Sequence, residues 1–181
     1  MIDKIVFYKL KNYQVKVVIA NYGCTIISIF TPDKNNVLKN IVAGFNDPSQ
    51  YLTNHPYMSA TVERFANRIV FGKLVIDGKQ YQLSLNNKAN HLHGGINGFD
   101  KKCWKLEDDN DGLLFSYTSL DGEEGYSAKL ILHIYFPLSS NAVKLSKMEV
   151  AGEDTRHGKF PGLVSPPTLY LTALNYHLIM S

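Results

Sequence analysis

The chain has 181 residues, of which 45% are hydrophobic and 19% are charged, and its formal net charge is +3. This balance fits one globular domain with a sizeable core, and it excludes a disordered chain. The 19 lysines and arginines are dispersed along the sequence, so we expect no nucleic-acid partner. Residues 1–20 mix charged with apolar side chains, which predicts neither a signal peptide nor a membrane span. The two cysteines form no disulfide or Cys-x-x-Cys pattern, and we expect a cytoplasmic location.

Short runs rich in β-branched and aromatic residues follow one another along the chain, separated by residues typical of turns. The strands predicted from these runs are residues 5–8, 15–19, 26–30, 37–42, 68–71, 73–76, 81–83, 113–118 and 129–136. Asp77-Gly78 predicts a hairpin turn, and no long run shows a helical period. The sequence therefore predicts an all-β fold, most simply a β-sandwich.

The last part of the chain differs in composition. Beyond about Val150 the sequence becomes rich in glycine, proline and serine, and an apolar run follows at 169–180. We therefore expect a single domain over residues 1–181 that is incomplete at its C-terminus, with 151–181 as a divergent stretch. A loop followed by a last strand is the alternative.

Three segments carry polar side chains suited to binding or catalysis, and the first is Arg64-Phe65-Ala66-Asn67-Arg68-Ile69. Arginine offers five fixed donors, and asparagine offers both donors and an acceptor, which suits the hydroxyl array of a sugar. In a strand, Arg64 and Arg68 would share one face and Asn67 would lie on the other. On composition alone, a pair of surface arginines is the favoured interpretation.

The second segment is Asn90-His91-Leu92-His93-Gly94-Gly95, in which the glycines allow close approach of backbone to a ligand. In a strand His91 and His93 would project to one face, as in the metal site of a cupin sandwich. Further ligands at a sensible spacing are not recognisable, so we expect no metal. For His91, as for His133, we expect a hydrogen-bonded structural role.

The third segment is Asp121-Gly122-Glu123-Glu124-Gly125-Tyr126. Two adjacent carboxylates invite an acid/base interpretation, but neighbours in an extended chain point to opposite faces. Glu123 and Glu124 are therefore predicted to be solvated or structural charges on a turn.

Taken together, these segments closely resemble the aldose 1-epimerase family. The matching elements occur in the family's order and spacing between Ile5 and about Leu145. They are Arg64–Ile69, Asp77-Gly78, Tyr81, Asn86-Asn87, Leu92–Gly95, Gly98–Lys101, Trp104 and Asp121–Tyr126. The resemblance implies a galactose mutarotase-like β-supersandwich that interconverts the α and β anomers of free hexoses such as galactose and glucose. It implies no cofactor: a carboxylate takes the proton of the C1 hydroxyl, and a histidine protonates the ring oxygen as the ring opens.

Carried over residue by residue, the resemblance implies that Asn67 and Arg68 bind sugar hydroxyls. It implies that His93 both binds the substrate and is catalytic, beside the ring oxygen or the anomeric centre. Phe99 and Trp104 are expected to be structural. Glu63 departs from the family pattern, which has glycine at that position, and a charged side chain there could disturb a close backbone approach.

A second departure lies near the C-terminus. The family's principal acid histidine falls in a segment matched by residues 171–178, where Leu174 takes its place and His177 comes three positions late. The family's catalytic glutamate would lie beyond Ser181, and His55 is read as incidental. The resemblance thus predicts impaired catalysis by these 181 residues. The alternatives are a non-catalytic carbohydrate-binding or regulatory module, and a truncated product that does not fold stably.

Overall fold

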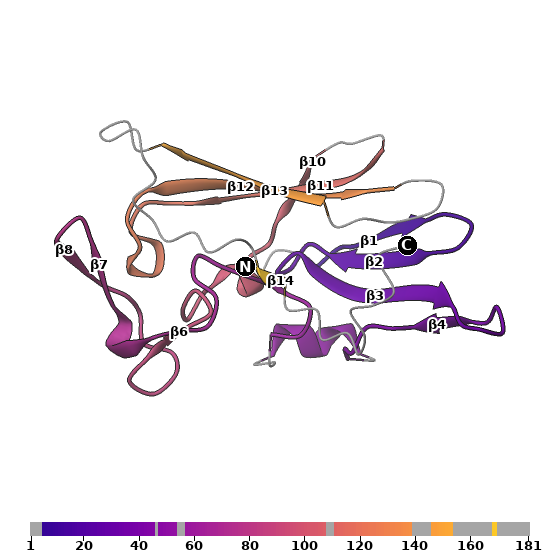
Figure 1. Ribbon diagram of the computed structural model, residues 1–181, viewed down its shortest axis with the longest axis horizontal. Helices are drawn as coiled ribbons and strands as arrows, with labels where there is room; N and C mark the ends of the chain where they lie inside the picture. The colour runs from indigo at the N-terminus through magenta and orange to yellow at the C-terminus, as the bar shows by residue number, and fades with distance from the viewer. Residues whose placement is uncertain are drawn as a thin grey trace.

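The structure is a computed structural model that describes residues 5–45, 47–53, 57–107 and 111–138, and the backbone of 146–153 and 168–169. Two four-stranded antiparallel sheets dominate it. The first has the order β1-β2-β3-β4, formed by Phe7–Lys11, Lys16–Ala20, Thr25–Pro32 and Leu38–Asn40. The second has the order β10-β11-β12-β13, formed by Lys105–Glu107, Gly112–Ser119, Lys129–Pro137 and Ser146–Glu153. In Figure 1 the second sheet runs across the top of the molecule, and the first sheet lies beneath its right-hand half.

The core lies between the two sheets and follows from the alternation of their strands. In β12 every second side chain is buried, and β2 buries Val17 and Ile19 from the other sheet. The β12 side chains concerned are Leu130, Leu132, Ile134 and Phe136. Tyr8 of β1 and Phe115 of β11 meet edge to face across the interface, with ring centroids 5.4 Å apart. Each large apolar side chain buried in this way stabilises the fold by roughly 1.5–3 kcal/mol. The predicted all-β sandwich is confirmed.

The chain between the two sheets is less regular, and it carries the segments singled out from the sequence. Its strands are short: β5 (Thr61–Val62), β6 (Arg68–Ile69), β7 (Lys73–Ile76), β8 (Lys79–Gln82) and β9 (His91–Leu92). β6 pairs with β9, β5 pairs with β14 (Thr168–Leu169), and β7 and β8 form the predicted hairpin, which projects at the left of Figure 1. The helical turns within the described residues are short 3-10 segments: η1 (Pro48–Leu52), η2 (Val70–Gly72), η3 (Phe99–Lys101) and η4 (Glu123–Gly125). No helix in this part of the chain is long and apolar enough to span a bilayer.

Several strand ends differ from the prediction, and the structure adds strands that were not predicted, β5, β9, β10 and β13. Two of the differences bear on the site and on the C-terminal stretch. The strand expected over 68–71 ends at Ile69, because Phe71 adopts a left-handed backbone conformation (φ +54°) inside η2. The loop expected from about Val150 begins later, since β13 continues along the β12 ladder to the pair Lys129–Glu153. The interpretations of His55, Leu174 and His177 fall outside the described residues, as does most of 151–181.

Candidate active site

The pairing of β6 with β9 places the first two polar segments side by side. Arg68 lies opposite Leu92 and Ile69 opposite His91. One step further, the backbone N–H of Asn67 donates to Nδ1 of His93 over 3.1 Å. The N–H of His93 donates in return to the carbonyl of Asn67 over 3.0 Å. Asn67, Arg68 and His93, which the sequence singled out together, are therefore neighbours.

The contact with Asn67 determines which nitrogen of His93 carries its proton. Because Nδ1 accepts the amide hydrogen bond, the proton of the neutral ring lies on Nε2. Burial lowers the pKa of His93, and the positive charges of Arg68 and Lys101 lower this pKa further. Only 9% of the residue is exposed. His93 is therefore an uncharged donor at neutral pH, able to hydrogen-bond a substrate oxygen through Nε2–H.

Two residues beside His93 were not assigned to the site from the sequence. The ring of Tyr57 lies 4.6 Å from that of His93, and the Lys101 ammonium lies 5.1 Å from the Tyr57 centroid. Lys101 also pairs with the buried carboxylate of Asp100 at 2.7 Å. Lys101 belongs to a family motif that could have signalled it, whereas nothing in the sequence around Tyr57 distinguished that residue from a core aromatic.

Arg68 and Asn67 are exposed at the surface next to His93. Nε of Arg68 donates to Oδ1 of Asn87 over 3.1 Å, and one of its terminal nitrogens lies 3.5 Å from Oδ1 of Asn67. The guanidinium is thus oriented by two side-chain amides while it remains open to solvent. This geometry suits a group that binds hydroxyls arriving from outside.

His91 is held differently from His93, and the expected shared face is wrong. β9 ends at Leu92, and His93 has a left-handed backbone (φ +50°), which breaks the alternation of a strand. Nδ1–H of the fully buried His91 donates to the Ser84 carbonyl (2.8 Å), and its Nε2 accepts from the Tyr126 hydroxyl (2.7 Å). Both nitrogens are engaged, so the structural interpretation of His91 fits. Within the described residues, no three His, Cys, Asp or Glu side chains gather as metal ligands would.

The two arginines of the first segment have opposite environments, so the interpretation as a surface pair is wrong for Arg64. Arg64 is buried and donates to Oγ of Ser119, to the carbonyl of Ser127 (2.8 Å) and to that of Leu120 (3.2 Å). Residues 63–67 form a bend between β5 and β6, and Asn67 is left-handed (φ +73°). A bend of this kind removes the strand alternation that would have placed Arg64 and Arg68 on one face.

Glu63, the residue that replaces a family glycine, is fully buried. Neither carboxyl oxygen has a hydrogen-bond partner among the described residues, and burial raises the pKa of Glu63 to about 9. The side chain is therefore an uncharged acid at neutral pH. Its backbone carbonyl is pressed against Gly94, where a Cβ would overlap the oxygen. The close backbone approach expected near this position thus exists, and the larger side chain at 63 does not prevent it.

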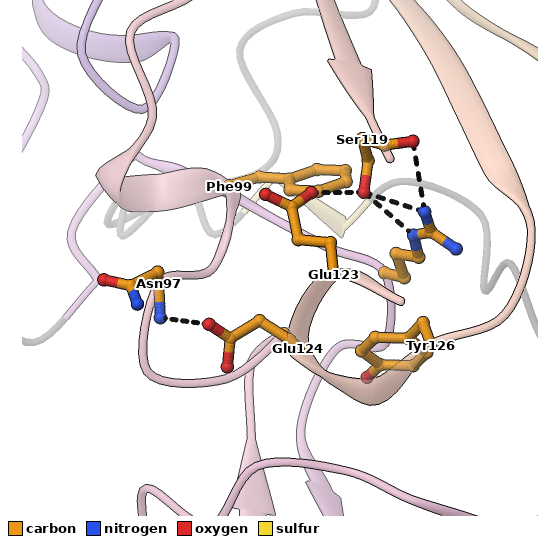
Figure 2. Close-up of a pocket in the computed structure, with 8 residues that line it drawn as sticks. Asn97, Phe99, Ser119, Glu123, Glu124 and Tyr126 are labelled. Atoms are coloured by element: carbon orange, nitrogen blue, oxygen red, sulfur yellow. Dashed lines mark hydrogen bonds between the residues drawn. The ribbon is translucent and has the colours of Figure 1, made fainter. Parts of the chain in front are cut away.

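Glu123 and Glu124 are structural, and they serve different parts of the chain (Figure 2). Glu123 pairs with Lys102 at 2.6 Å and accepts hydrogen bonds from Tyr117 and Ser119. Glu124 accepts instead from backbone amides of Ile96 and Asn97 and from Ser84. The hollow between them is too tight to hold a water molecule, so it offers no substrate site. Phe99 and Trp104 are both buried, and Nε1 of Trp104 donates to the Phe99 carbonyl over 3.2 Å, as a structural role requires.

The architecture defines a galactose mutarotase-like β-sandwich. It matches the GalM/aldose epimerase homologue from C. elegans with a TM-score of 0.69 at 27% identity, covering 75% of this chain and 42% of that one. The galactose 1-epimerase of Lactobacillus acidophilus matches with a TM-score of 0.64, also at 27% identity, over 75% of this chain and 41% of that one.

The sequence agrees with this assignment. Residues 7–159 match the aldose 1-epimerase family, and the chain belongs to that family. It is 38% identical to the galactose mutarotase of Sus scrofa and 35% identical to that of Homo sapiens. Each of these matches extends over 148 residues, which are 82% of this chain and 43% of the relative. The chain therefore spans less than half the length of these relatives, and the family resemblance inferred from its motifs is confirmed.

Proposed function

We propose that this chain binds a free hexose such as galactose or glucose beside His93 and interconverts its α and β anomers by opening the ring. The relatives named galactose mutarotase support the substrate class. The observation that carries the proposal is the hydrogen bond from the backbone N–H of Asn67 to Nδ1 of His93, since it leaves the ring proton on Nε2 for a sugar oxygen to accept. The proposed reaction uses no metal and no cofactor.

In this proposal each residue of the site has a separate role. Nε2–H of the uncharged His93 hydrogen-bonds the ring oxygen and polarises the C1–O bond, and water supplies the proton that this oxygen gains as the bond breaks. Arg68 and Asn67 hold hydroxyl groups and keep the sugar in place. Another group must take the proton of the C1 hydroxyl, because ring opening leaves an aldehyde at C1.

Among the described residues, the carboxylates around His93 do not supply that base. Glu123 and Glu124 are engaged by the partners described above. Asp100 is buried and paired with Lys101, and Glu63 is buried and protonated. The family resemblance assigns the base to a glutamate outside these residues. We therefore propose that turnover by the 181 residues alone is far slower than that of a full-length relative.

A second candidate is a carbohydrate-binding or regulatory module without turnover. Arg68 and Asn67 are exposed and already oriented, so they can hold a sugar whether or not a base is present. The free cysteines Cys24 and Cys103 agree with the cytoplasmic location that we propose for either function.

Polarimetry of freshly dissolved α-D-galactose tests the proposal. The decay rate is measured at several concentrations of the purified chain, with full-length pig galactose mutarotase as the positive control. We expect a rate proportional to protein that falls about 10²–10⁴-fold in His93→Ala. His133→Ala on β12 is the matched control and should retain the rate.

A parallel titration with D-galactose, followed by NMR, separates the two candidates. Binding without acceleration, lost in Arg68→Ala, would favour the carbohydrate-binding module. If the chain neither binds galactose or glucose nor accelerates mutarotation, the proposal is refuted.

A further inference from the structure

The segment that carries His93 is held by side chains from two other parts of the chain. We refer to residues 92–97 as the His93 loop. On one side, Nδ2 of Asn86 donates to the carbonyls of Leu92 and Gly95, each over 2.8 Å. Oδ1 of the same amide accepts from the Leu92 N–H over 2.7 Å. One asparagine therefore makes three hydrogen bonds to the backbone of the loop.

On the other side, the carboxylate of Glu124 accepts two successive backbone amides. Oε2 accepts from Ile96 N–H over 2.8 Å, and Oε1 accepts from Asn97 N–H over 2.9 Å, the latter drawn in Figure 2. Oε2 is also contacted by the Ser84 hydroxyl. We refer to these hydrogen bonds to Glu124 as the Glu124 clamp. Hydrogen bonds to an ionised acceptor are about twice as strong as neutral ones, so the clamp holds the loop backbone strongly.

The backbone of the loop explains why such a clamp is needed. His93 (φ +50°), Gly94 (φ +86°) and Gly95 (φ +110°) are consecutive residues with positive φ. A residue with a Cβ is destabilised in this conformation, and His93 is such a residue. At Gly95 a Cβ would overlap Oε2 of Glu124, so the glycine permits the approach of the carboxylate.

We infer that Glu124, assisted by Asn86, is a positioning residue for His93. By fixing the loop in this left-handed path, Glu124 keeps Nδ1 of His93 at the Asn67 amide and the ring proton on Nε2. The consequence for sugar chemistry rests on the proposed function. The effect on the histidine itself does not, because the state of the ring can be observed without turnover.

Glu123 provides the contrast within the same turn. It is the adjacent residue, also a carboxylate, and its hydrogen bonds and ion pair go to Tyr117, Ser119 and Lys102 rather than to backbone amides of the His93 loop. Glu123→Gln and Glu124→Gln therefore make the same chemical change at neighbouring positions. A general loss of stability is expected from both, and a change at His93 only from Glu124→Gln.

Long-range ¹H–¹⁵N NMR of the histidine rings, recorded against pH, is the test. In the unsubstituted chain we expect His93 to show Nε2 protonated and Nδ1 unprotonated above its pKa. In Glu124→Gln we expect a mixture of the two tautomers and a shifted pKa, whereas Glu123→Gln should keep the His93 signals. Where mutarotation is measurable, kcat should fall about 10²-fold with little change in KM, as for a misplaced catalytic group.

Asn86→Asp is the second variant, in case Glu124→Gln does not fold. It retains the acceptor for the Leu92 amide but loses both donors, so the same NMR change is expected. A folded Glu124→Gln or Asn86→Asp chain with unaltered His93 signals would overturn the inference. A chain without mutarotase activity that still shows the tautomer change would refute the proposed reaction and leave the positioning role supported.

Discussion

Asn67 and His93 are joined by two hydrogen bonds whose donors are backbone N–H groups, one from each residue. The backbone N–H of Asn67 donates to Nδ1 of the His93 ring over 3.1 Å, and the backbone N–H of His93 donates to the backbone carbonyl of Asn67 over 3.0 Å. Both residues have left-handed backbones, which turn the chain out of the ladder that joins β6 and β9. The site is therefore formed where two short strands end rather than along their faces.

Replacing Arg68 with methionine should raise the pKa of His93. The guanidinium contributes to the lowering of that pKa, and methionine removes the charge while keeping a side chain of similar length. An NMR titration of the His93 ring measures the change, and Lys101→Met, which removes the other contributing cation, should act in the same direction. A pKa that stays the same or falls in Arg68→Met would contradict this electrostatic account.

Substituting Arg64 should lower the free energy of unfolding much more than substituting Arg68. Arg64→Met strips donors from the buried Ser119 hydroxyl and from the carbonyls of Leu120 and Ser127, and we expect a loss of about 3 kcal/mol in the free energy of unfolding. Arg68→Met lies at the surface and should change that free energy by less than about 0.5 kcal/mol. Urea denaturation of both variants measures the difference. Equal losses would mean that the burial of Arg64 has little energetic weight.

Glu63→Gln should make the protein more stable near neutral pH. The folded chain holds the Glu63 proton up to a pKa of about 9, whereas the unfolded chain releases it near 4.5. The stability contributed by the protonated form is therefore complete below about pH 4.5 and is lost as the pH rises towards 9. The slope is at most about 1.4 kcal/mol per pH unit.

Denaturation curves between pH 5 and 9 check this prediction, because glutamine removes the slope. Glu107→Gln is the control: hydrogen bonds from Lys105 and Ser116 lower the pKa of Glu107, so its effect belongs to more acidic conditions. The account of Glu63 fails if Glu63→Gln and the parent chain show parallel curves over this range.

Gly94→Ala should be much more damaging than Gly78→Ala. Both glycines have positive φ, +86° and +76°, so each substitution carries a conformational cost of about 1 kcal/mol. A Cβ at Gly78 would meet nothing within 4 Å, whereas at Gly94 it would overlap the Glu63 carbonyl oxygen. We expect a total loss of about 3 kcal/mol or more for Gly94→Ala. Similar midpoints in urea would show that backbone conformation alone determines the need for glycine at 94.

The regular parts of this fold could be predicted because their pattern is local. Residues 129–136 are a continuous run rich in β-branched and aromatic side chains, and β12 is found at Lys129–Pro137. β13 was not predicted, because Glu149, Gly152 and Glu153 are residue types depleted in strands. Their strand conformation comes from pairing with β12, and that partner is not visible in their own sequence.

In the site, too, some features could be predicted from the sequence and others depend on distant partners. The order of the family motifs was enough to group Asn67, Arg68 and His93, and the functions assigned to these residues remain predictions. The burial of Arg64 could not be predicted, since its partner Ser119 lies 55 positions away. The engagement of Glu124 with the His93 loop was equally hidden, because its contacts with Ile96 and Asn97 join two separate motifs.

The connectivity of the sheets implies an order of folding. In both four-stranded sheets every strand pairs with its neighbour in sequence, so each sheet closes only short loops. The pair of β5 with β14 instead joins Val62 to Thr168, more than a hundred positions apart, at a higher entropic cost of loop closure. We therefore expect the two four-stranded sheets to form first and the β5–β14 pair to form last. Pulse-labelled hydrogen exchange during refolding should protect the amides of β12 before those of β14.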